Sequence, residues 1–194
     1  MEACIALPEP SPAVTLEDFL ELERATGLRH EWIKGMASAM AGGSAEHSRI
    51  KTNLLLAIGR QLEGSDCHVA DSDQRIRVEL TGATLYADVA VICGPYAYAS
   101  DDLQAVTNPK IAVEVLSSTT EDYDRGTKFQ HYRRVPGLLE YVLISQDERR
   151  IEVRRRAEDK WVLEEHTSGA LELLEGITVP FDTIYDFRHL RPEG

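Results

Sequence analysis

Two acidic residues interrupt apolar segments of the chain. Glu114 lies within the apolar run 111–116, and Asp88 lies within the apolar run 85–93. Short apolar runs of this kind predict buried strands, and an unpaired charge inside such a strand is very costly. Each acid must therefore be paired, protonated or bound to a cation. If the two strands are neighbours, both carboxylates can face one point, where two oxygen ligands suit Mg²⁺ or Mn²⁺.

A lysine follows these acids on a predicted helix over 121–134. Asp124, Lys128 and Tyr132 stand at i, i+4 and i+8, so they lie on roughly one face of that helix. Lys128 could stabilise charge on a phosphorane-like transition state or hold an attacking water. Tyr132 at such a position is more often part of the core.

The same residues also have a simpler interpretation. One acid could form a structural ion pair with Lys128 or Arg125, which we would favour for a single buried acid. Two acids in successive strands, followed by a helix that carries a lysine, favour a metal site. The backbone carbonyl of Val115 could then supply a third ligand.

Glu31 and His47 are weaker candidates for the same site. Glu31 lies in the alternating segment 28–36, which predicts a hairpin with its turn near Lys34-Gly35 and with Glu31 pointing opposite to Trp32. His47 lies in the first turn of a helix for which Ser44 is the predicted N-cap. Either could position a water, since histidine is the common general base. Taken alone, each is more often a surface or helix-terminus residue.

The charge of the chain argues against strong attraction to nucleic acid. Its formal net charge is −12, so the overall field does not attract a polyphosphate. A nucleic-acid role must then depend on a local basic patch or a bound cation. The dense basic run at 149–156 could touch phosphates, but its default interpretation is a solvated strand edge.

The supporting elements predict one domain of mixed α/β or α+β class. Their order is helix, hairpin, helix, strands, helix, strands. The first helix begins after Thr15 and ends at Gly27, and residues 1–14, with three prolines, predict an irregular arm. We therefore expect a single domain over 15–190.

Composition fits a cytoplasmic protein. Of the 194 residues, 43% are hydrophobic and 28% are charged, which is ordinary for a globular domain. No apolar run approaches the ~20 residues of a membrane span, and the N-terminus lacks the pattern of a signal peptide. The three cysteines form no CxxC pair, which predicts reduced thiols. Phosphate-loop, dinucleotide, zincin and GxSxG motifs are absent from the sequence.

Four segments carry a resemblance to a known family. They are ADVAVIC, NPKIAVEVLSSTTEDYDRGTKFQHYRR with its continuation to RRR at 154–156, HEWIKG and SAEHSRI. Together they resemble the Uma-two family, a large bacterial endonuclease family similar to the PD-(D/E)XK (restriction-endonuclease-like) superfamily. The similarity extends from about residue 16 to about residue 187.

The resemblance implies a fold and a set of site residues. It implies a restriction-endonuclease-like core, in which a central mixed sheet is flanked by helices, with an N-terminal helix-hairpin extension. It implies Mg²⁺ (or Mn²⁺) held by Asp88 and Glu114. Leu116 stands where the superfamily has its lysine, so the lysine appears moved to Lys128. Glu31 and His47 match family positions near the site.

The function expected from these observations is metal-dependent hydrolysis of DNA phosphodiester bonds. A homodimer is expected as well, since cutting both strands needs two sites. Two alternatives remain open. One is a catalytically silent binding or regulatory module of the same fold, and the other is a small-molecule phosphohydrolase, which suits the acidic surface better than duplex DNA does.

Overall fold

The computed structural model describes residues 13–40, 42–188 and 190. The predicted irregular arm over 1–14 lies outside the described residues except for its last two positions. The helical elements are α1 (Leu16–Thr26), α2 (Ala45–Gln61), α3 (Glu121–Tyr123), the π-helix η1 (Asp124–Lys128), α4 (Phe129–Tyr132), the 3₁₀-helix η2 (Leu174–Gly176) and α5 (Phe181–Ile184).

The strands form two larger sheets and one small one. They are β1 (His30–Ile33), β2 (Met36–Ala39), β3 (Cys67–Asp71), β4 (Arg75–Val78), β5 (Ala83–Tyr86), β6 (Val89–Cys93), β7 (Ala105–Val106), β8 (Pro109–Leu116), β9 (Glu140–Ser145), β10 (Ile151–Ala157), β11 (Lys160–His166), β12 (Ala170–Glu172) and β13 (Thr178–Pro180). Their orders are β2-β1-β5-β4-β7, β11-β10-β9-β8-β6-β3 and β12-β13.

The six-stranded sheet contains the core that the resemblance implied. Strands β3, β6 and β8 pair antiparallel, and β8 then pairs parallel with β9. A parallel pair needs a crossover connection, which the segment α3–η1–α4 supplies. The order α2, three strands, helix, strand confirms the predicted core and the mixed α+β class.

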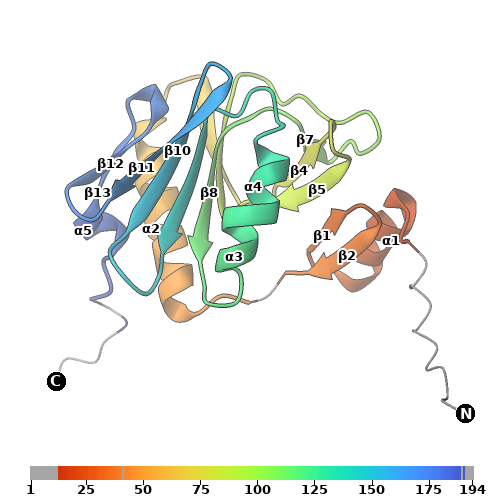
Figure 1. The fold of residues 1–194 in the computed structure, drawn as a ribbon, viewed down its shortest axis with the longest axis horizontal. Coiled ribbons are helices and arrows are strands. Elements are labelled where there is room, and N and C mark those ends of the chain that lie inside the picture. Colours follow the sequence, from red (N-terminus) through yellow and green to blue (C-terminus); the bar gives the residue numbers. More distant parts are fainter. Residues whose placement is uncertain (1–12, 41, 189, 191–194) are drawn as a thin grey trace, which may run out of the picture.

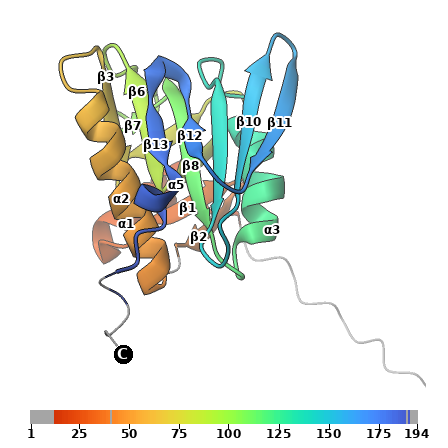
Figure 2. The ribbon, with the colours of Figure 1, turned by 90° about the vertical axis from the view of Figure 1, so that its left-hand side faces the viewer.

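Side chains alternate between the two faces of this sheet, and each face has its own helical cover. Figure 2 shows α2 and α3 on opposite sides of the sheet. Ile111 and Val113 of β8 pack in one cluster with Ile50 of α2. Ala112 and Leu116 pack instead with residues of α4 and β5. Because successive strand residues point to opposite faces, Glu114 must face the side of α3–η1–α4.

The N-terminal extension begins as predicted. The side chains and backbone N–H groups of Thr15 and Asp18 form a reciprocal capping box at the start of α1. The helix ends at Gly27, whose φ of 69° is easy for glycine alone. The hairpin β1–β2 follows, beside α1 (Figure 1), and its turn falls at Lys34-Gly35, both with positive φ.

The predicted strand over 85–93 is wrong in one respect. The chain leaves one sheet after β5 and enters the other at β6, so Ala87 and Asp88 lie between two strands rather than inside one. The apolar character of both short strands is continuous across this junction, which is why the sequence pattern concealed it. As a result Asp88 stands at the entry of β6 instead of in mid-strand.

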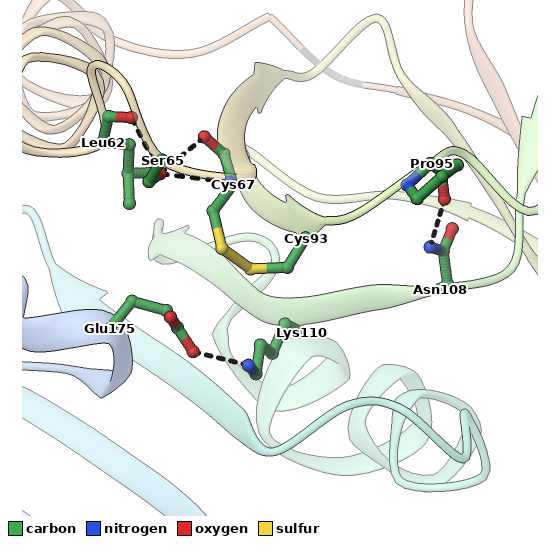
Figure 3. The surroundings of a disulfide bond; sticks show 8 residues. All are labelled: Leu62, Ser65, Cys67, Cys93, Pro95, Asn108, Lys110 and Glu175. Atoms are coloured by element: carbon green, nitrogen blue, oxygen red, sulfur yellow. Dashed lines mark hydrogen bonds and ion pairs between the residues drawn. A yellow bond between two sulfur atoms is a disulfide. The ribbon is translucent and has the colours of Figure 1, made fainter.

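The expectation of reduced thiols is also wrong for two of the cysteines. Cys67 and Cys93 lie directly opposite one another on β3 and β6 and form a disulfide (Figure 3). The Ser65 hydroxyl accepts a hydrogen bond from the Cys67 N–H. Spacing in the sequence gave no sign of this pair, because its proximity arises from strand register alone. Cys4 lies outside the described residues.

The basic run at 149–156 contributes to the structure more than a solvated edge would. Arg154 donates a hydrogen bond to the carbonyl oxygen of Arg125, and Arg155 is paired with Glu140. Arg156 donates to the carbonyl oxygens of Leu138, Arg133 and Val135. These three guanidinium groups therefore tie β10 to its neighbours and have few donors left for phosphates.

In the described part of the chain, no helix combines the length and apolar character needed to cross a membrane.

Removal of the disulfide should lower the stability of the fold. The bridge closes a loop between residues 26 positions apart, and the chain-entropy account assigns about 3 kcal/mol to a loop of this size. We expect the Cys67→Ser/Cys93→Ser variant to unfold at lower urea concentration by that free energy, and a thiol reductant to bring the wild-type protein to the same midpoint. A midpoint unchanged by the reductant would contradict the disulfide.

Candidate active site

The register of β6 and β8 brings the two strand-associated acids together. Val89 pairs with Val113, which places Asp88 across from Glu114 on the face covered by α3–η1–α4. The Asp88 Oδ2 atom accepts a hydrogen bond of 2.8 Å from the Val115 N–H. The prediction that the two strands are neighbours is therefore confirmed, and both carboxylates line one cavity.

Lys128 reaches these acids from a π-helical turn. Its Nζ atom lies 2.9 Å from Glu114 Oε2 and 3.6 Å from Asp124 Oδ1. The predicted regular helix over 121–134 is wrong here, because the five residues of η1 form a π-helix between α3 and α4. Such π-turns are frequent at functional sites. This one leaves both Asp124 and Lys128 buried.

Tyr132, the third member of the predicted helix face, belongs to the core. Its ring packs against Tyr141 with a centroid separation of 5.4 Å, and its side chain is completely buried. Its hydroxyl has no hydrogen-bond partner among the described residues. The sequence-based preference for a core role is consistent with this packing.

Glu31 joins the site from the N-terminal hairpin. Trp32 packs against Phe19 of α1, with ring centroids 6.3 Å apart, so Glu31 on the opposite face of β1 points toward the cavity. Its Oε1 atom lies 3.0 Å from Lys128 Nζ, and its Oε2 atom accepts a 2.5 Å hydrogen bond from the Tyr123 hydroxyl. Sequence reasoning missed Tyr123, which precedes Asp124 and has no distinguishing pattern of its own.

His47 reaches the site from the first turn of α2. Ser44 caps that helix by accepting a hydrogen bond from the His47 N–H, as predicted. The ring Nε2 lies 3.1 Å from Asp88 Oδ1. Gly43 leaves room for the ring, since a Cβ at that position would lie 2.7 Å from it. His47 therefore holds Asp88 from the side opposite to the Val115 N–H.

The charges at this site do not balance. We call Glu31, Asp88, Glu114, Asp124 and Lys128 the acid–lysine cluster; it contains four carboxylates and one ammonium, all with little solvent exposure. Burial of ions is expensive unless their charges are compensated. The cluster must therefore take up protons or an additional cation.

The pKa values of the cluster show how this imbalance is distributed. Burial, reinforced by the neighbouring acids and only partly offset by Lys128, holds the pKa of Glu114 well above its usual value. Burial likewise raises the pKa of Asp124. Burial opposes ionisation of Asp88 too, but hydrogen bonds from His47 and the Val115 N–H outweigh it and lower its pKa. The attraction of the acids, Glu114 first, overcomes burial and raises the pKa of Lys128.

The cluster forms part of the wall of a cavity of about 500 Å³. Further lining residues come from the hairpin and from the segment between β8 and η1: Ile33, Met36, Ser38, Ala39, Met40, His47, Val115, Thr119, Thr120, Tyr123 and Thr127. The cavity thus has one ionic side and one side with mostly apolar side chains. All six residues predicted for the site line it.

The donor set fits a hard divalent cation. The Glu114 Oε1 atom is buried and lacks a hydrogen-bond partner among the described residues, so one carboxylate oxygen is available for a ligand. Within those residues, the one trio of His, Cys, Asp or Glu ligand atoms that lie mutually close is Cys67, Cys93 and Glu175, away from this cavity. A cation at the cluster would thus be held by few protein oxygens, which is the usual mode of Mg²⁺.

Loss of Lys128 should destabilise the fold through the acids that it leaves behind. Breaking a buried ion pair at one end costs about 3–5 kcal/mol, so we expect Lys128→Met to lower the free energy of unfolding by that amount at neutral pH. Glu114→Gln in the same chain should recover part of the loss, because the remaining buried charge falls. Urea denaturation of the four proteins of this cycle measures the coupling.

The exposed Lys160 provides the matched control, since Lys160→Met changes the same residue type without uncovering a buried acid. Strictly additive losses from Lys128→Met and Glu114→Gln would contradict a direct interaction between the two groups.

Comparisons with known proteins identify the family of the chain. The Uma2 family model, described as "Putative restriction endonuclease", matches residues 16–182. The chain is 36% identical over 179 residues to the uncharacterised protein slr1290 of Synechocystis, covering 91% of this chain and 93% of that relative. It is 32% identical over 153 residues to the uncharacterised Synechocystis protein sll1609, covering 78% and 86%.

One solved structure has the same fold. It is a crystal structure from Anabaena variabilis, titled as that of "a putative nuclease belonging to DUF820", with a TM-score of 0.72 and 15% sequence identity. The similarity covers 90% of this chain and 98% of that one. The implied restriction-endonuclease-like architecture is consistent with this likeness. From the extent of the family match and the identity to its relatives, the chain belongs to the Uma2 family.

Proposed function

We propose that the protein is a metal-dependent endonuclease that hydrolyses phosphodiester bonds in DNA. The observation that carries this proposal is the convergence of Asp88 and Glu114, from paired strands, with the buried Lys128 in one cavity. Membership of a family described as restriction endonucleases and the nuclease title of a fold neighbour support the same reaction class.

Asp88 and Glu114 are the proposed cation ligands, with the carbonyl of Val115 as a third. Hydrogen bonds from His47 and from the Val115 N–H fix the Asp88 carboxylate. The Glu114 Oε1 atom has no competing partner among the described residues. Mg²⁺ or Mn²⁺ bound here would supply an acidified water and an electrophile for a phosphate oxygen. The backbone contact of Asp88 lets a change at Val115 alter both groups together.

Lys128 is the proposed cationic group for the reacting phosphate. Its ammonium is the one lysine nitrogen among the cavity-lining residues, and it can hold a water or offset charge that develops on phosphate oxygens. Glu31 and Asp124 keep it protonated and fix its position. Tyr123 in turn holds Glu31. His47 serves as a positioning residue for Asp88 in this proposal.

The catalytically silent module is the weaker alternative. A binding relic has no need for four buried carboxylates around one lysine, an arrangement that reduces stability unless a ligand compensates it. The small-molecule phosphohydrolase draws support from the charge of −12 and from the modest cavity volume of about 500 Å³. Substrate choice in the cleavage assay separates it from the nuclease.

Cleavage of plasmid and single-stranded DNA at low salt tests the proposal directly. With Mg²⁺ or Mn²⁺, we expect the wild-type protein to cut, and Glu114→Gln and Lys128→Ala each to lose about 100-fold in rate or more. The physical reasons are the lost cation ligand and the lost positive charge. Glu158→Gln and Lys160→Ala, both at exposed positions, are the matched controls and should cut like the wild-type protein.

Equal cutting by all five proteins would mean that a contaminating nuclease is responsible. Absence of cutting, together with retained metal binding and hydrolysis of a small phosphodiester, would replace the proposal with the phosphohydrolase. Absence of both cutting and metal binding would favour the silent module.

Metal affinity should increase with pH. The pKa of Glu114 is raised by burial and by its acidic neighbours, so at low pH a cation must displace a proton before it can bind. We expect the Mn²⁺ association constant from calorimetry to rise between about pH 6 and about pH 8, with protons released on binding. In Glu114→Gln this pH dependence should disappear along with most of the affinity. An association constant that is flat with pH would count against Glu114 as a ligand.

A homodimer is part of the proposal, because cutting both strands of a duplex needs two sites. Light scattering should give twice the monomer mass of 21.7 kDa at micromolar concentration. A monomer under these conditions would limit each encounter to a cut in one strand.

A further inference from the structure

The side of the cavity opposite the acids is built from one face of the hairpin. Ile33 pairs with Met36 and Glu31 pairs with Ser38 across β1 and β2, so these four side chains share a face. Ala39 and Met40 extend it beyond the strand. We call Ile33, Met36, Ala39 and Met40 the apolar wall. The same hairpin therefore presents one acid to Lys128 and an apolar surface beside it.

The apolar wall is unusually open to solvent for its composition. Met36 is 68% exposed, and Ala39 is also exposed. Exposed apolar side chains that are contiguous with a polar site often mark a ligand-binding surface. Methionine, with its flexible and polarizable thioether, adapts to flat ligands of varying shape. The wall is therefore suited to the planar, largely apolar faces of nucleobases.

The reacting groups, by contrast, are withdrawn from the surface. The side chains of Glu114 and Lys128 are only 3% and 7% exposed, and those of His47 and Asp88 are 15% and 12% exposed. A phosphate must enter the cavity to meet them. In an intact duplex, base stacking and pairing hold the phosphates at the outside of a stiff helix. Enzymes whose reacting groups are recessed act on nucleotides that have left the stack.

The surrounding charges do not favour binding of an intact duplex either. Duplex affinity comes mainly from lysine and arginine contacts to phosphates. The three arginines at 154–156, the densest basic stretch, are engaged in hydrogen bonds to carbonyl oxygens or acids. The net charge of −12 works against any long-range attraction. Contacts to a base must therefore supply much of the affinity.

We propose that the apolar wall is the binding subsite for the base of an unpaired nucleotide next to the scissile phosphate. The substrate class would then be single-stranded DNA, or duplex with locally unpaired nucleotides, rather than intact duplex. This inference rests on the proposed nuclease function and narrows its substrate. The Met36 and Met40 side chains contact the base face, while the acid–lysine cluster receives the phosphate.

The test compares three labelled oligonucleotide substrates of one sequence: single-stranded, fully paired, and paired except for a central bulge. We expect the wild-type protein to cut the single-stranded and bulged substrates about 10-fold faster than the paired one. Met36→Ser/Met40→Ser should lose about 10-fold on the first two substrates. Leu103→Ser is the matched control, since Leu103 is 77% exposed and lies outside the cavity; it should cut like the wild-type protein.

A binding measurement separates this inference from the function on which it rests. Fluorescence anisotropy with a short oligothymidine and the Glu114→Gln protein reports binding without cutting. Adding Met36→Ser/Met40→Ser to that protein should raise the dissociation constant about 10-fold. Wall-dependent binding without cleavage by the wild-type protein would support the subsite and reject the nuclease.

Three results would overturn the subsite. The first is equal cutting of paired and bulged substrates, and the second is unchanged cutting and binding after both methionines are replaced. Either of these, with metal-dependent cleavage intact, leaves the proposed nuclease function standing. The third is failure of the wild-type protein both to bind and to cut the oligonucleotides, which rejects the subsite and the function together.

Discussion

The ion pair between Lys128 and Glu114 is the interaction on which the site depends. Its two charged groups are 2.9 Å apart and almost fully buried, in a place where three further carboxylates also converge. One ammonium cannot compensate four carboxylates, so the arrangement is costly in isolation. Structures retain such costs mainly where a ligand or a reaction uses them, and an additional cation would relieve this one.

Three separate parts of the chain are needed to build this pair and its surroundings. Strand register fixes Asp88 across from Glu114, and the π-helix η1 brings Lys128 down onto the same face of the sheet. The hairpin then adds Glu31, which is tied to Lys128 on one side and to Tyr123 on the other. The hairpin is therefore a structural member of the site as well as its apolar wall, which links substrate contact to the position of the lysine.

Much of this could be predicted from the sequence because local signals were strong. The capping box after Thr15 and the turn at Lys34-Gly35 depend on a few adjacent residues, and the alternation along β8 indicated the face of Glu114. The π-turn, the switch of sheets at Asp88 and the Cys67–Cys93 disulfide depend on register and packing between distant segments. The basic run was misjudged for the same reason, since its carbonyl partners lie on other elements.

The most direct test of the acid–lysine cluster as a cation site is anomalous diffraction from crystals grown with Mn²⁺. The account predicts a peak in anomalous density within coordination distance of the Asp88 and Glu114 carboxylates, about 2.2 Å from their oxygens, and no peak in Glu114→Gln. Crystals with Mn²⁺ bound elsewhere, or with Lys128 still seated on Glu114 and no density at the cluster, would contradict it.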